Sequence, residues 1–445
     1  MKSAQVIIIG GGLAGCEAAW QLLRRGHSVC LYEMKPQKFS PAHKMESLAE
    51  LVCSNSLKSN SPDSAPGLLK NEMRSLNSLI MCAADAAAVS AGSALAVDRV
   101  TFSQNVEKKL CAEKNFILIR KECANIPEGF LTIIATGPLT SDALANQITE
   151  LLGSSYLYFY DAIAPIVEAN SIDRKKVYWA SRYDKGTPDY LNCPLSEEEY
   201  KIFRRELLAG EKMALKPFEE IRHFEGCLPI EISAARGKNT LAFGPMKPVG
   251  LPNPATGKTP YAVVQLRREN YAATLFNMVG FQTKLTWPEQ KRIFRLIPGL
   301  ENAHFARYGS IHRNTYIDSP SLLQKSLQLK TKPNVFFAGQ ITGVEGYLES
   351  AAMGLLAGLN AAFIKEGRKL EPPPEATALG ALIHYITCKP SMSFQPMNIN
   401  FGLLEKHQEN KTNKKDKKRI YVETAHHALN LWMSSQKLNQ ESIKV

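Results

Sequence analysis

Two cysteines stand in sequence contexts that suit a reactive thiol. Cys53 is followed by the polar residues Ser54, Asn55 and Ser56, so no helical apolar face is available to bury it. Cys227 follows a glycine and precedes a proline by two positions, a pattern that indicates a fixed turn. A thiolate at either position would be a nucleophile. Free cysteine is also among the most buried residue types, so a small buried hydrophobe remains the alternative at both positions.

The other cysteines indicate a reducing compartment. The chain of 445 residues has nine cysteines at irregular spacings, with no CxxC pair. This pattern argues against a disulfide framework and against a structural zinc site, and we predict no metal. Cys16 and Cys30 fall within a predicted helix and a predicted strand, where we expect both to be buried and inert.

A glycine-rich turn near the start of the chain predicts a dinucleotide site. The apolar run Val6–Ile9 is typical of a buried parallel strand, and GGGLAG (10–15) follows it directly. Helical spacing then continues to Gly26, and a second predicted strand, 28–32, leads to Glu33. The glycines permit a close approach to a pyrophosphate, and Glu33 is placed to accept a hydrogen bond from a ribose hydroxyl. This unit predicts a bound FAD or NAD.

Two later strands favour FAD. The apolar segments 131–135 and 335–338 both lead into glycine-containing turns, and GVEG (343–346) with a long helical pattern follows the second. Another helix N-terminus would thus point towards the cofactor, as in many FAD proteins. The predicted cofactor-binding residues are Gly10, Gly11, Gly12, Leu13, Ala14, Gly15, Glu33, Thr136, Gly137, Gly339, Gln340, Gly343, Glu345, Gly346 and Tyr347.

These segments predict an α/β fold with a discontinuous nucleotide-binding domain. If both later strands return to the first sheet, a Rossmann-like, glutathione-reductase-like FAD domain is assembled from N-terminal and C-terminal segments. We expect its two parts to span 1–155 and 321–445, with an inserted α+β domain over 156–320. The insertion is rich in Pro, Tyr and Arg, and we expect it to handle the substrate.

The charge balance favours a polyanion partner. Lys and Arg total 54 against 42 acidic residues, a formal net charge of +12, so RNA or DNA is favoured over an anionic membrane. A basic run at 411–419 precedes a predicted final helix, 421–432, although a solvated face is the commoner explanation for such a run. The chain begins with no signal-peptide pattern, and the Ala- and Ser-rich stretch 78–97 contains Asp85. We therefore expect a cytoplasmic protein without a membrane partner.

Several longer segments resemble the folate- and FAD-dependent tRNA uracil-5-methyltransferases, the TrmFO family. The resemblance runs nearly end to end, and is therefore more specific than a shared nucleotide-binding fold. The segments that carry it are LVCSNSL (51–57), LAVDR (95–99), IATGPLT (134–140), FEGCLPIE (224–231), FGPMKPVG (243–250), HRNT (312–315), FAGQITGVEGY (337–347) and FQPMNINFG (394–402).

The resemblance implies methylation at C5 of a T-loop uridine in tRNA. It implies 5,10-methylenetetrahydrofolate as carbon donor, and FAD, reduced by NADPH or NADH, as carrier and reductant; no obligate protein partner is evident. The family's two functional cysteines fall on Cys53 and Cys227. We assign Cys227 as the nucleophile that adds to uracil C6, and Cys53 as the candidate for removal of the C5 proton or for a resting adduct that shields the flavin. Ser93 and Met353 depart from the family's usual small residues without touching this chemistry.

Other side chains have less certain roles, and three other functions stay open. Lys58, Arg236 or Lys247 could lie near a thiol, and Tyr347 could stack on the flavin or the pterin, although packing is the commoner role of such a tyrosine. The pair His312 and Arg313 could contact folate or phosphate, or simply face solvent.

The alternative functions are the same chemistry on a ribosomal-RNA uridine, a non-catalytic RNA-binding flavoprotein, and a small-molecule flavin or thiol-disulfide oxidoreductase. The last of these would be favoured by a CxxC pair, which the sequence does not contain.

Overall fold

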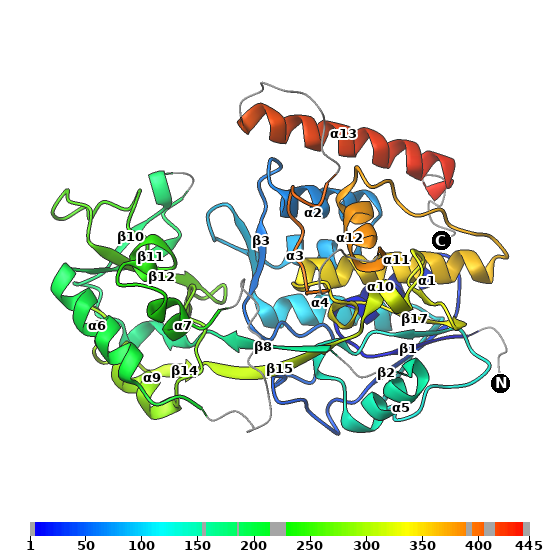
Figure 1. The fold of residues 1–445 in the computed structure, drawn as a ribbon, viewed down its shortest axis with the longest axis horizontal. Coiled ribbons are helices and arrows are strands. Elements are labelled where there is room, and N and C mark those ends of the chain that lie inside the picture. Colours follow the sequence, from blue (N-terminus) through cyan, green and yellow to red (C-terminus); the bar gives the residue numbers. More distant parts are fainter. Residues whose placement is uncertain are drawn as a thin grey trace.

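The protein has two lobes, each built around its own six-stranded sheet (Figure 1). The structure is a computed structural model that describes residues 5–153, 157–184, 187–213, 228–388, 394–404 and 414–438. We call the part around the sheet that contains Val6–Ile9 the first lobe. The part around the sheet that contains Ala262–Arg268 is the second lobe.

The sheet of the first lobe is mostly parallel. Its first strand is buried at every position, as expected for an apolar run covered on both faces. Parallel pairing joins five of the strands, and β16 adds an antiparallel edge. The order across the sheet is β16 (Gln328–Leu329), β17 (Lys332–Phe337), β7 (Thr132–Ile134), β1 (Val6–Ile9), β2 (Val29–Glu33) and β6 (Phe116–Arg120).

The two later strands do return to this sheet. In the register, Thr132 of β7 lies opposite Ile7 of β1 on one side and opposite Val335 of β17 on the other. The α/β, Rossmann-like prediction is therefore confirmed, with β2 one residue later than expected. Cys16 and Cys30 are buried as predicted, and burial raises the pKa of both thiols.

Helix α11 lies directly against α1. Two glycines on α11 make this approach possible: a Cβ at Gly354 would collide with the backbone of Ala14, and one at Gly358 would come within 2.6 Å of the Ala18 carbonyl oxygen. The helices of the first lobe are α1 (Leu13–Leu23), α2 (Ala65–Ser75), α3 (Leu79–Ala86), α4 (Arg99–Cys111), α5 (Asp142–Leu152), α10 (Ser319–Leu322), α11 (Tyr347–Lys365), α12 (Ala378–Thr387) and α13 (Lys414–Ser435).

Burial explains the apolar composition of α11. Among the described residues it is the one helix long and apolar enough to cross a membrane, and 83% of its apolar window is buried inside the protein.

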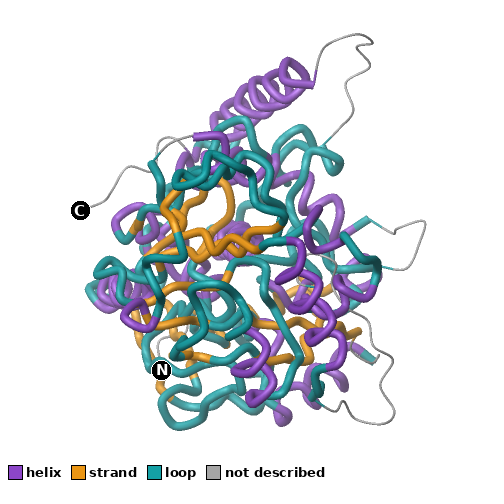
Figure 2. Tube along the Cα trace, turned by 90° about the vertical axis from the view of Figure 1, so that its left-hand side faces the viewer, coloured by secondary structure: helices purple, strands orange, loops and turns teal. Residues whose placement is uncertain are grey.

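Helix α13, by contrast, lies along an outer edge of the molecule, at the top of Figures 1 and 2. It begins seven residues before the predicted final helix; the basic residue Lys411 lies outside the described residues.

A small antiparallel sheet stands beside the first lobe. The stretch 78–97 forms α3 and two of its strands rather than one long helix. The sheet has the order β3 (Ser56–Ser59), β5 (Ala94–Val97) and β4 (Ala88–Val89). Its first strand directly follows the Cys53 loop, which we define as residues 51–55.

The second lobe has an antiparallel sheet and a separate apolar core. Phe203, Phe281 and Phe294 are fully buried between this sheet and its helices. The strand order is β10 (Tyr178–Ala180), β11 (Tyr190–Leu195), β12 (Ala262–Arg268), β13 (Leu275–Met278), β9 (Ile166–Glu168) and β14 (Phe305–Arg307). The helices are α6 (Glu197–Ala209), α7 (Ile230–Ala235), α8 (Thr240–Phe243) and α9 (Trp287–Phe294).

Two paired strands join the lobes. The antiparallel strands β8 (Leu157–Ile163) and β15 (Ser310–Tyr316) run between the lobes as a ribbon (Figure 1). The chain thus enters the second lobe next to where it leaves it. The residue limits predicted for the inserted domain, 156–320, stay a prediction.

The close contact of α1 and α11 predicts a destabilised Gly354→Ala variant. The added methyl group would meet the Ala14 backbone, which cannot move away as a flexible side chain would. We expect the free energy of unfolding to fall by about 1–3 kcal/mol in urea denaturation. Lys365→Ala, an exposed change on the same helix, should stay within about 0.5 kcal/mol of the parent chain. Equal stability of both variants would contradict this packing.

Candidate active site

The predicted glycine turn joins β1 to α1. Gly10 has φ +106°, a conformation that favours glycine, and the Gly11 N–H donates to Glu33 Oε2 at 2.9 Å. A Cβ at Gly15 would collide with the Gly10 carbonyl oxygen, so glycine is needed for the close passage of helix and turn. Glu33 is nearly buried and also accepts the Lys35 N–H at 2.9 Å. Its carboxylate therefore fixes the turn and retains lone pairs for a ligand.

Space is left open in front of the first turn of α1. Gly12 is the N-cap residue, and no side chain caps this end of the helix. A Cβ built on Gly12 would have no atom within 4 Å. Helix N-terminal N–H groups carry partial positive charge, so this uncapped end suits a phosphate that approaches the backbone closely.

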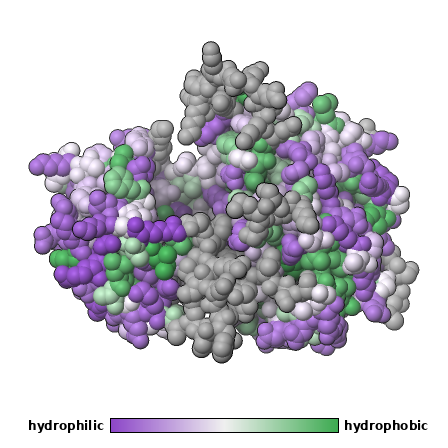
Figure 3. Space-filling view, viewed as in Figure 1, coloured by the Kyte–Doolittle hydropathy of each residue, from purple (hydrophilic) through white to green (hydrophobic). Residues whose placement is uncertain are grey.

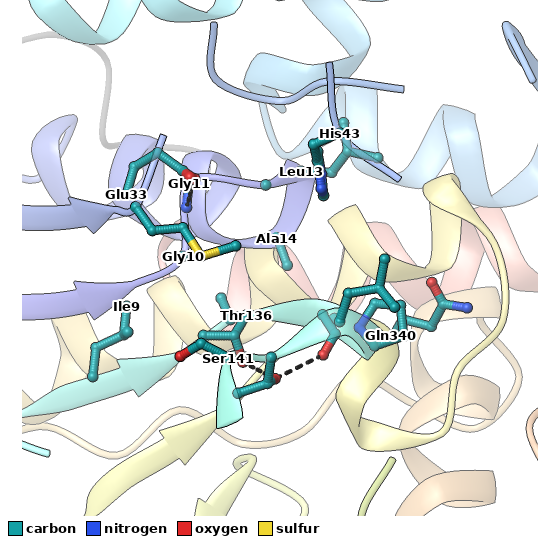
Figure 4. Close-up of a pocket in the computed structure, with 18 of the residues that line it drawn as sticks. Ile9, Gly10, Gly11, Leu13, Ala14, Glu33, His43, Thr136, Ser141 and Gln340 are labelled. Carbon is teal, nitrogen blue, oxygen red and sulfur yellow. Dashed lines mark hydrogen bonds between the residues drawn. The ribbon is translucent and has the colours of Figure 1, made fainter. Parts of the chain in front are cut away.

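A large pocket extends from this turn along the carboxyl ends of the strands. It encloses about 1050 Å³, including space open to solvent. Figure 4 shows the turn and His43 on one side, with Thr136, Ser141 and Gln340 across from them. The predicted cofactor-binding residues that line the pocket are Gly10, Gly11, Gly12, Leu13, Ala14, Glu33, Thr136, Gly137, Gly339, Gln340 and Tyr347.

The other predicted cofactor residues lie behind the pocket wall. Besides Gly15, these are Gly343, Glu345 and Gly346. Gly343 has φ +84° and packs on Phe394, while Glu345 accepts a hydrogen bond of 2.6 Å from the pocket residue Gln340. Gly346, at φ +115°, is the N-cap of α11. They shape the turn that carries Gln340 and Tyr347, and direct binding by them stays a prediction.

Loop residues complete the pocket and were missed by the sequence analysis. Met34, His43, Glu50, Lys121 and Ser141 belong to segments with no helical or strand periodicity, so no pattern pointed to them. Burial, with help from the Lys35 ammonium, lowers the pKa of His43. His43 Nδ1 lies 2.5 Å from the Ser40 hydroxyl. A neutral imidazole thus faces this end of the pocket.

Tyr347 connects the pocket to the Cys53 loop. Its hydroxyl oxygen lies 2.6 Å from Cys53 N, 3.2 Å from Ser54 N and 2.9 Å from Cys53 Sγ. Both N–H groups and the thiol donate to this oxygen, and the hydroxyl can donate its own proton to the sulfur once the sulfur is a thiolate. Burial, and then the neighbouring Cys53, raise the pKa of Tyr347 well above its ordinary value. The tyrosine therefore keeps the proton that it donates.

Two arginines hold the Cys53 loop from its other side. Arg99 donates to the Leu51 carbonyl at 2.5 Å, and Arg307 donates to the carbonyls of Val52 at 2.8 Å and Cys53 at 3.2 Å. Burial and the nearby Arg99 charge lower the pKa of Arg307 to about 10. The Arg307 guanidinium therefore stays charged at neutral pH. Arg99 also forms an ion pair with the buried Glu269, so part of the positive charge beside this half-buried thiol is neutralised within the fold.

Of the cations proposed from the sequence, Lys58 has another partner: its Nζ pairs with the buried Glu349 at 2.6 Å. Arg236, the C-cap of α7, and Lys247 lie in the second lobe, and a role for either beside Cys227 stays a prediction. The signal for Arg99 was present in LAVDR (95–99), but the sequence could not show where its side chain points.

Some predicted residues cannot be placed. Cys227 lies outside the described residues, so its assignment stays a prediction. Of His312 and Arg313, only the backbone is described, within β15. The distance between Cys53 and Cys227 therefore lies outside the described structure.

The sheet order, the glycine turn and the pocket define a Rossmann-like dinucleotide-binding protein of the glutathione-reductase-like class. The model of the family "Glucose inhibited division protein A" matches residues 5–369. Two crystal forms of Aquifex aeolicus GidA share the fold, with TM-scores of 0.72 and 0.69 at 17% and 16% identity. The alignments cover 99% and 98% of this chain, and 76% and 75% of the GidA chain.

Curated relatives are far more similar in sequence. A Syntrophus aciditrophicus protein is 60% identical, with 97% of this chain and 98% of that protein covered. A Geobacter sulfurreducens protein is 57% identical, with 97% and 99% covered. Both are named methylenetetrahydrofolate--tRNA-(uracil-5-)-methyltransferase TrmFO. The chain belongs to the TrmFO family.

The residues of the pocket fit FAD. The uncapped start of α1, with open space over Gly12, would hold the pyrophosphate, and the Glu33 carboxylate would accept from a ribose hydroxyl. The pocket continues past Thr136 and Gln340 to Tyr347, so the flavin end of the cofactor would lie towards Cys53.

The open space over Gly12 predicts that Gly12→Ala weakens FAD binding without unfolding the chain. The new methyl group meets no protein atom but takes the place where a pyrophosphate would approach. We expect less bound FAD per chain, measured by absorbance, and an unfolding free energy of the cofactor-free chain within about 0.5 kcal/mol of the parent. Gly11→Ala, whose Cβ would meet Glu33 Oε2 at 2.7 Å, should lower both. Full FAD content in Gly12→Ala would refute this placement.

The hydrogen bond from Tyr347 predicts a less reactive Cys53 in Tyr347→Phe. Without the hydroxyl, the thiolate loses its donor and two N–H groups lose their acceptor. We expect Cys53 to be alkylated by iodoacetamide several-fold more slowly near neutral pH, followed by mass spectrometry of its peptide. Alkylation of the exposed Cys82 serves as the internal control and should not change. An unchanged Cys53 rate would mean that the hydroxyl only supports the loop.

Proposed function

We propose that this chain methylates C5 of a T-loop uridine in tRNA, with 5,10-methylenetetrahydrofolate as carbon donor and FAD as cofactor. The relatives named above carry this activity in their names at up to 60% identity over nearly their full length. The observation that carries the proposal is the position of Tyr347, which lines the cofactor pocket and whose hydroxyl contacts the Cys53 thiol at 2.9 Å. A thiol at the end of a flavin pocket suits a reaction that needs both a thiol and a flavin.

Each part of the pocket has its own task in this proposal. The N-terminal turn of α1 and Glu33 bind the dinucleotide, and Gln340 and Tyr347 border its flavin end. FAD, when bound, supplies redox chemistry: it takes electrons from NADPH or NADH and passes them to the one-carbon unit that the folate donates. The protein contributes binding, orientation and proton handling around it.

The cysteines activate the uracil, whose C5 is a poor nucleophile. In the proposed sequence the Cys227 thiolate bonds to C6, and the electrons of the C5–C6 double bond move towards O4, so that C5 becomes nucleophilic. After C5 has gained the new carbon, the Cys53 thiolate removes the C5 proton. The bond between the new carbon and its carrier breaks to leave an exocyclic methylene, and a hydride, whose electrons come from NADPH or NADH, adds to the methylene as the C6–sulfur bond breaks and returns the Cys227 thiolate. These roles rest on the family resemblance, with Cys227 outside the described residues.

The surroundings of Cys53 suit the removal of a proton. The base must be a thiolate before the step and a thiol after it. The Tyr347 hydroxyl can donate to the thiolate, and Arg307 adds a positive charge at the carbonyls of the loop, whereas the charge of Arg99 is paired with Glu269. Because Arg99 and Arg307 hold the loop by its carbonyls, the sulfur stays in place through the reaction.

The RNA substrate agrees with the charge of the protein. A uridine in a folded T-loop must leave its stack to reach a thiol, at a cost of roughly a few kcal/mol. Phosphate contacts from a chain of net charge +12 would offset this cost. We place this reaction in the cytoplasm.

The proposed function predicts product from a defined mixture. Purified protein with FAD, NADPH and methylenetetrahydrofolate should form 5-methyluridine in an unmodified tRNA transcript, measured by mass spectrometry. Cys227→Ala and Cys53→Ala should each lower the product at least about 100-fold, since each removes a step that no neighbour replaces. Omission of folate should abolish it.

Three controls separate the alternatives. FAD content of each variant shows that the pocket remains intact, and Cys82→Ala, at an exposed cysteine, should keep full activity. Product on ribosomal RNA but not on tRNA would move the proposal to that substrate. An FAD-loaded protein that binds RNA and methylates neither would support the non-catalytic alternative.

A further inference from the structure

A long segment of the second lobe carries basic residues and no acidic ones. Between Glu231 and Glu269, residues 232–268 contain six Lys or Arg and no Asp or Glu, although the whole chain has 42 acidic residues. The segment forms α8, the loops around it and β12. We call it the acid-free segment.

Three lysines of this segment carry charges that the described part of the fold does not pair. Lys238 and Lys258 are exposed and Lys247 is half-buried, and within the described ranges none of the three ammonium groups forms an ion pair. Other lysines of the same lobe do: Lys176 and Lys201 each pair with a glutamate, at 2.6 and 2.7 Å. Lys238 and Lys258 therefore present unpaired positive charge to solvent.

Exposed aromatic rings stand among these lysines. Phe243, the last residue of α8, is 77% exposed, and Tyr183 is 57% exposed. Tyr183 belongs to this surface because its N–H donates to the Gly250 carbonyl at 2.8 Å, and a Cβ at Gly250 would meet its ring at 2.8 Å. Arg182 adds a hydrogen bond to the Lys247 carbonyl at 3.0 Å. In Figure 3 the surface of the second lobe, on the left, is largely hydrophilic with small apolar patches.

The turn that presents Tyr183 is itself unusual. Tyr183 and Asp184 have φ +60° and +51°, and two successive non-glycine residues in this region cost conformational energy. The contacts with Gly250 hold the turn in this form. The turn therefore keeps the Tyr183 ring exposed, with the exposed Asp184 next to it in the chain.

The acid-free segment connects the surroundings of both predicted cysteines. It begins five residues after Cys227 in the chain. At its other end, Arg267 donates to Asn55 Oδ1 at 2.9 Å, and Asn55 Nδ2 donates to the Arg268 carbonyl at 3.0 Å. Asn55 is the last residue of the Cys53 loop. An RNA strand bound along this segment would thus lie next to the Cys53 loop.

We propose that the acid-free segment, with Tyr183, is the docking surface for the RNA substrate. Lysines without carboxylate partners suit phosphates, and exposed rings suit stacking of unpaired bases. This chemistry fits an RNA loop. It fits neither a membrane, which would need a larger apolar face, nor a second protein chain. The proposal rests on the proposed function, which it deepens by naming where the substrate binds.

The two kinds of contact give different signatures in binding. The test uses the FAD-loaded full chain and an unmodified tRNA transcript, with affinity measured by fluorescence anisotropy at several salt concentrations. Phe243→Ala and Tyr183→Ala should each weaken binding about 5- to 150-fold with an unchanged salt slope, because stacking releases no counterions. The double change Lys238→Ala and Lys258→Ala should lower the slope of log affinity against log salt by about 1 to 2.

Matched variants separate this surface from charge in general. Lys175→Ala with Lys291→Ala removes the same charge at exposed positions of the same lobe, outside the segment, and should leave the slope nearly unchanged. FAD content and unfolding of each variant show that the fold is kept. Variants that bind within twofold of the parent with the parent slope would overturn the proposal, as would a parent chain that does not bind the transcript.

Two further outcomes distinguish the other possibilities. If sedimentation shows that Phe243→Ala changes self-association while RNA affinity stays the same, the surface is a contact between copies of this chain, and the proposal fails. If the parent chain binds the transcript with the predicted signatures but forms no 5-methyluridine in it, the proposed function fails while the docking surface stands.

Discussion

The close approach of α1 and α11 is the constraint on which the site depends. Gly354 and Gly358 have no side chains, so the backbone of α11 can lie on that of α1. The first helix carries the glycine turn at its start, and the second carries Tyr347 at its start. One packing contact therefore sets both ends of the pocket and brings Tyr347 to Cys53, 294 residues away in the sequence. A separation of the helices by one methyl group would move the hydroxyl away from the sulfur.

The Cys53 loop is held by both lobes at once. Tyr347 and Arg99 contact it from the first lobe. From the second lobe, Arg307 donates to the Val52 carbonyl and Arg267 donates to Asn55, the last residue of the loop. Most of these bonds go to backbone groups or to the buried Asn55 amide. Such contacts fix the backbone of the loop, while the sulfur itself is contacted by the Tyr347 hydroxyl.

Local pattern was sufficient to predict the first sheet and its turn. The apolar run of β1, the glycines and Glu33 are adjacent in sequence, and each has one physical explanation. The same holds for β7 and β17, whose buried apolar character indicated return to this sheet. These elements place 11 of the predicted cofactor residues on the pocket wall, among them Gln340 and Tyr347.

The remaining site residues depend on contacts that no local pattern contains. His43 and Ser141 lie in loops, and the direction of a loop follows from what it packs against. Lys58 illustrates the limit: it is near Cys53 in sequence, but its ammonium group is drawn to the buried Glu349 of α11. Arg307 is distant in sequence and reaches the loop only because β14 belongs to the second lobe's sheet.

The ribbon of β8 and β15 also bears on how such a protein can evolve. Its strands run antiparallel, with Leu157 opposite Tyr316 and Ile163 opposite Ser310, so the chain leaves the first lobe and comes back about one strand spacing away. A short turn in place of the second lobe would close this gap without disturbing the order of the first sheet. The second lobe is thus a module that could be gained, exchanged or reshaped as one piece, while the cofactor half of the molecule keeps its architecture.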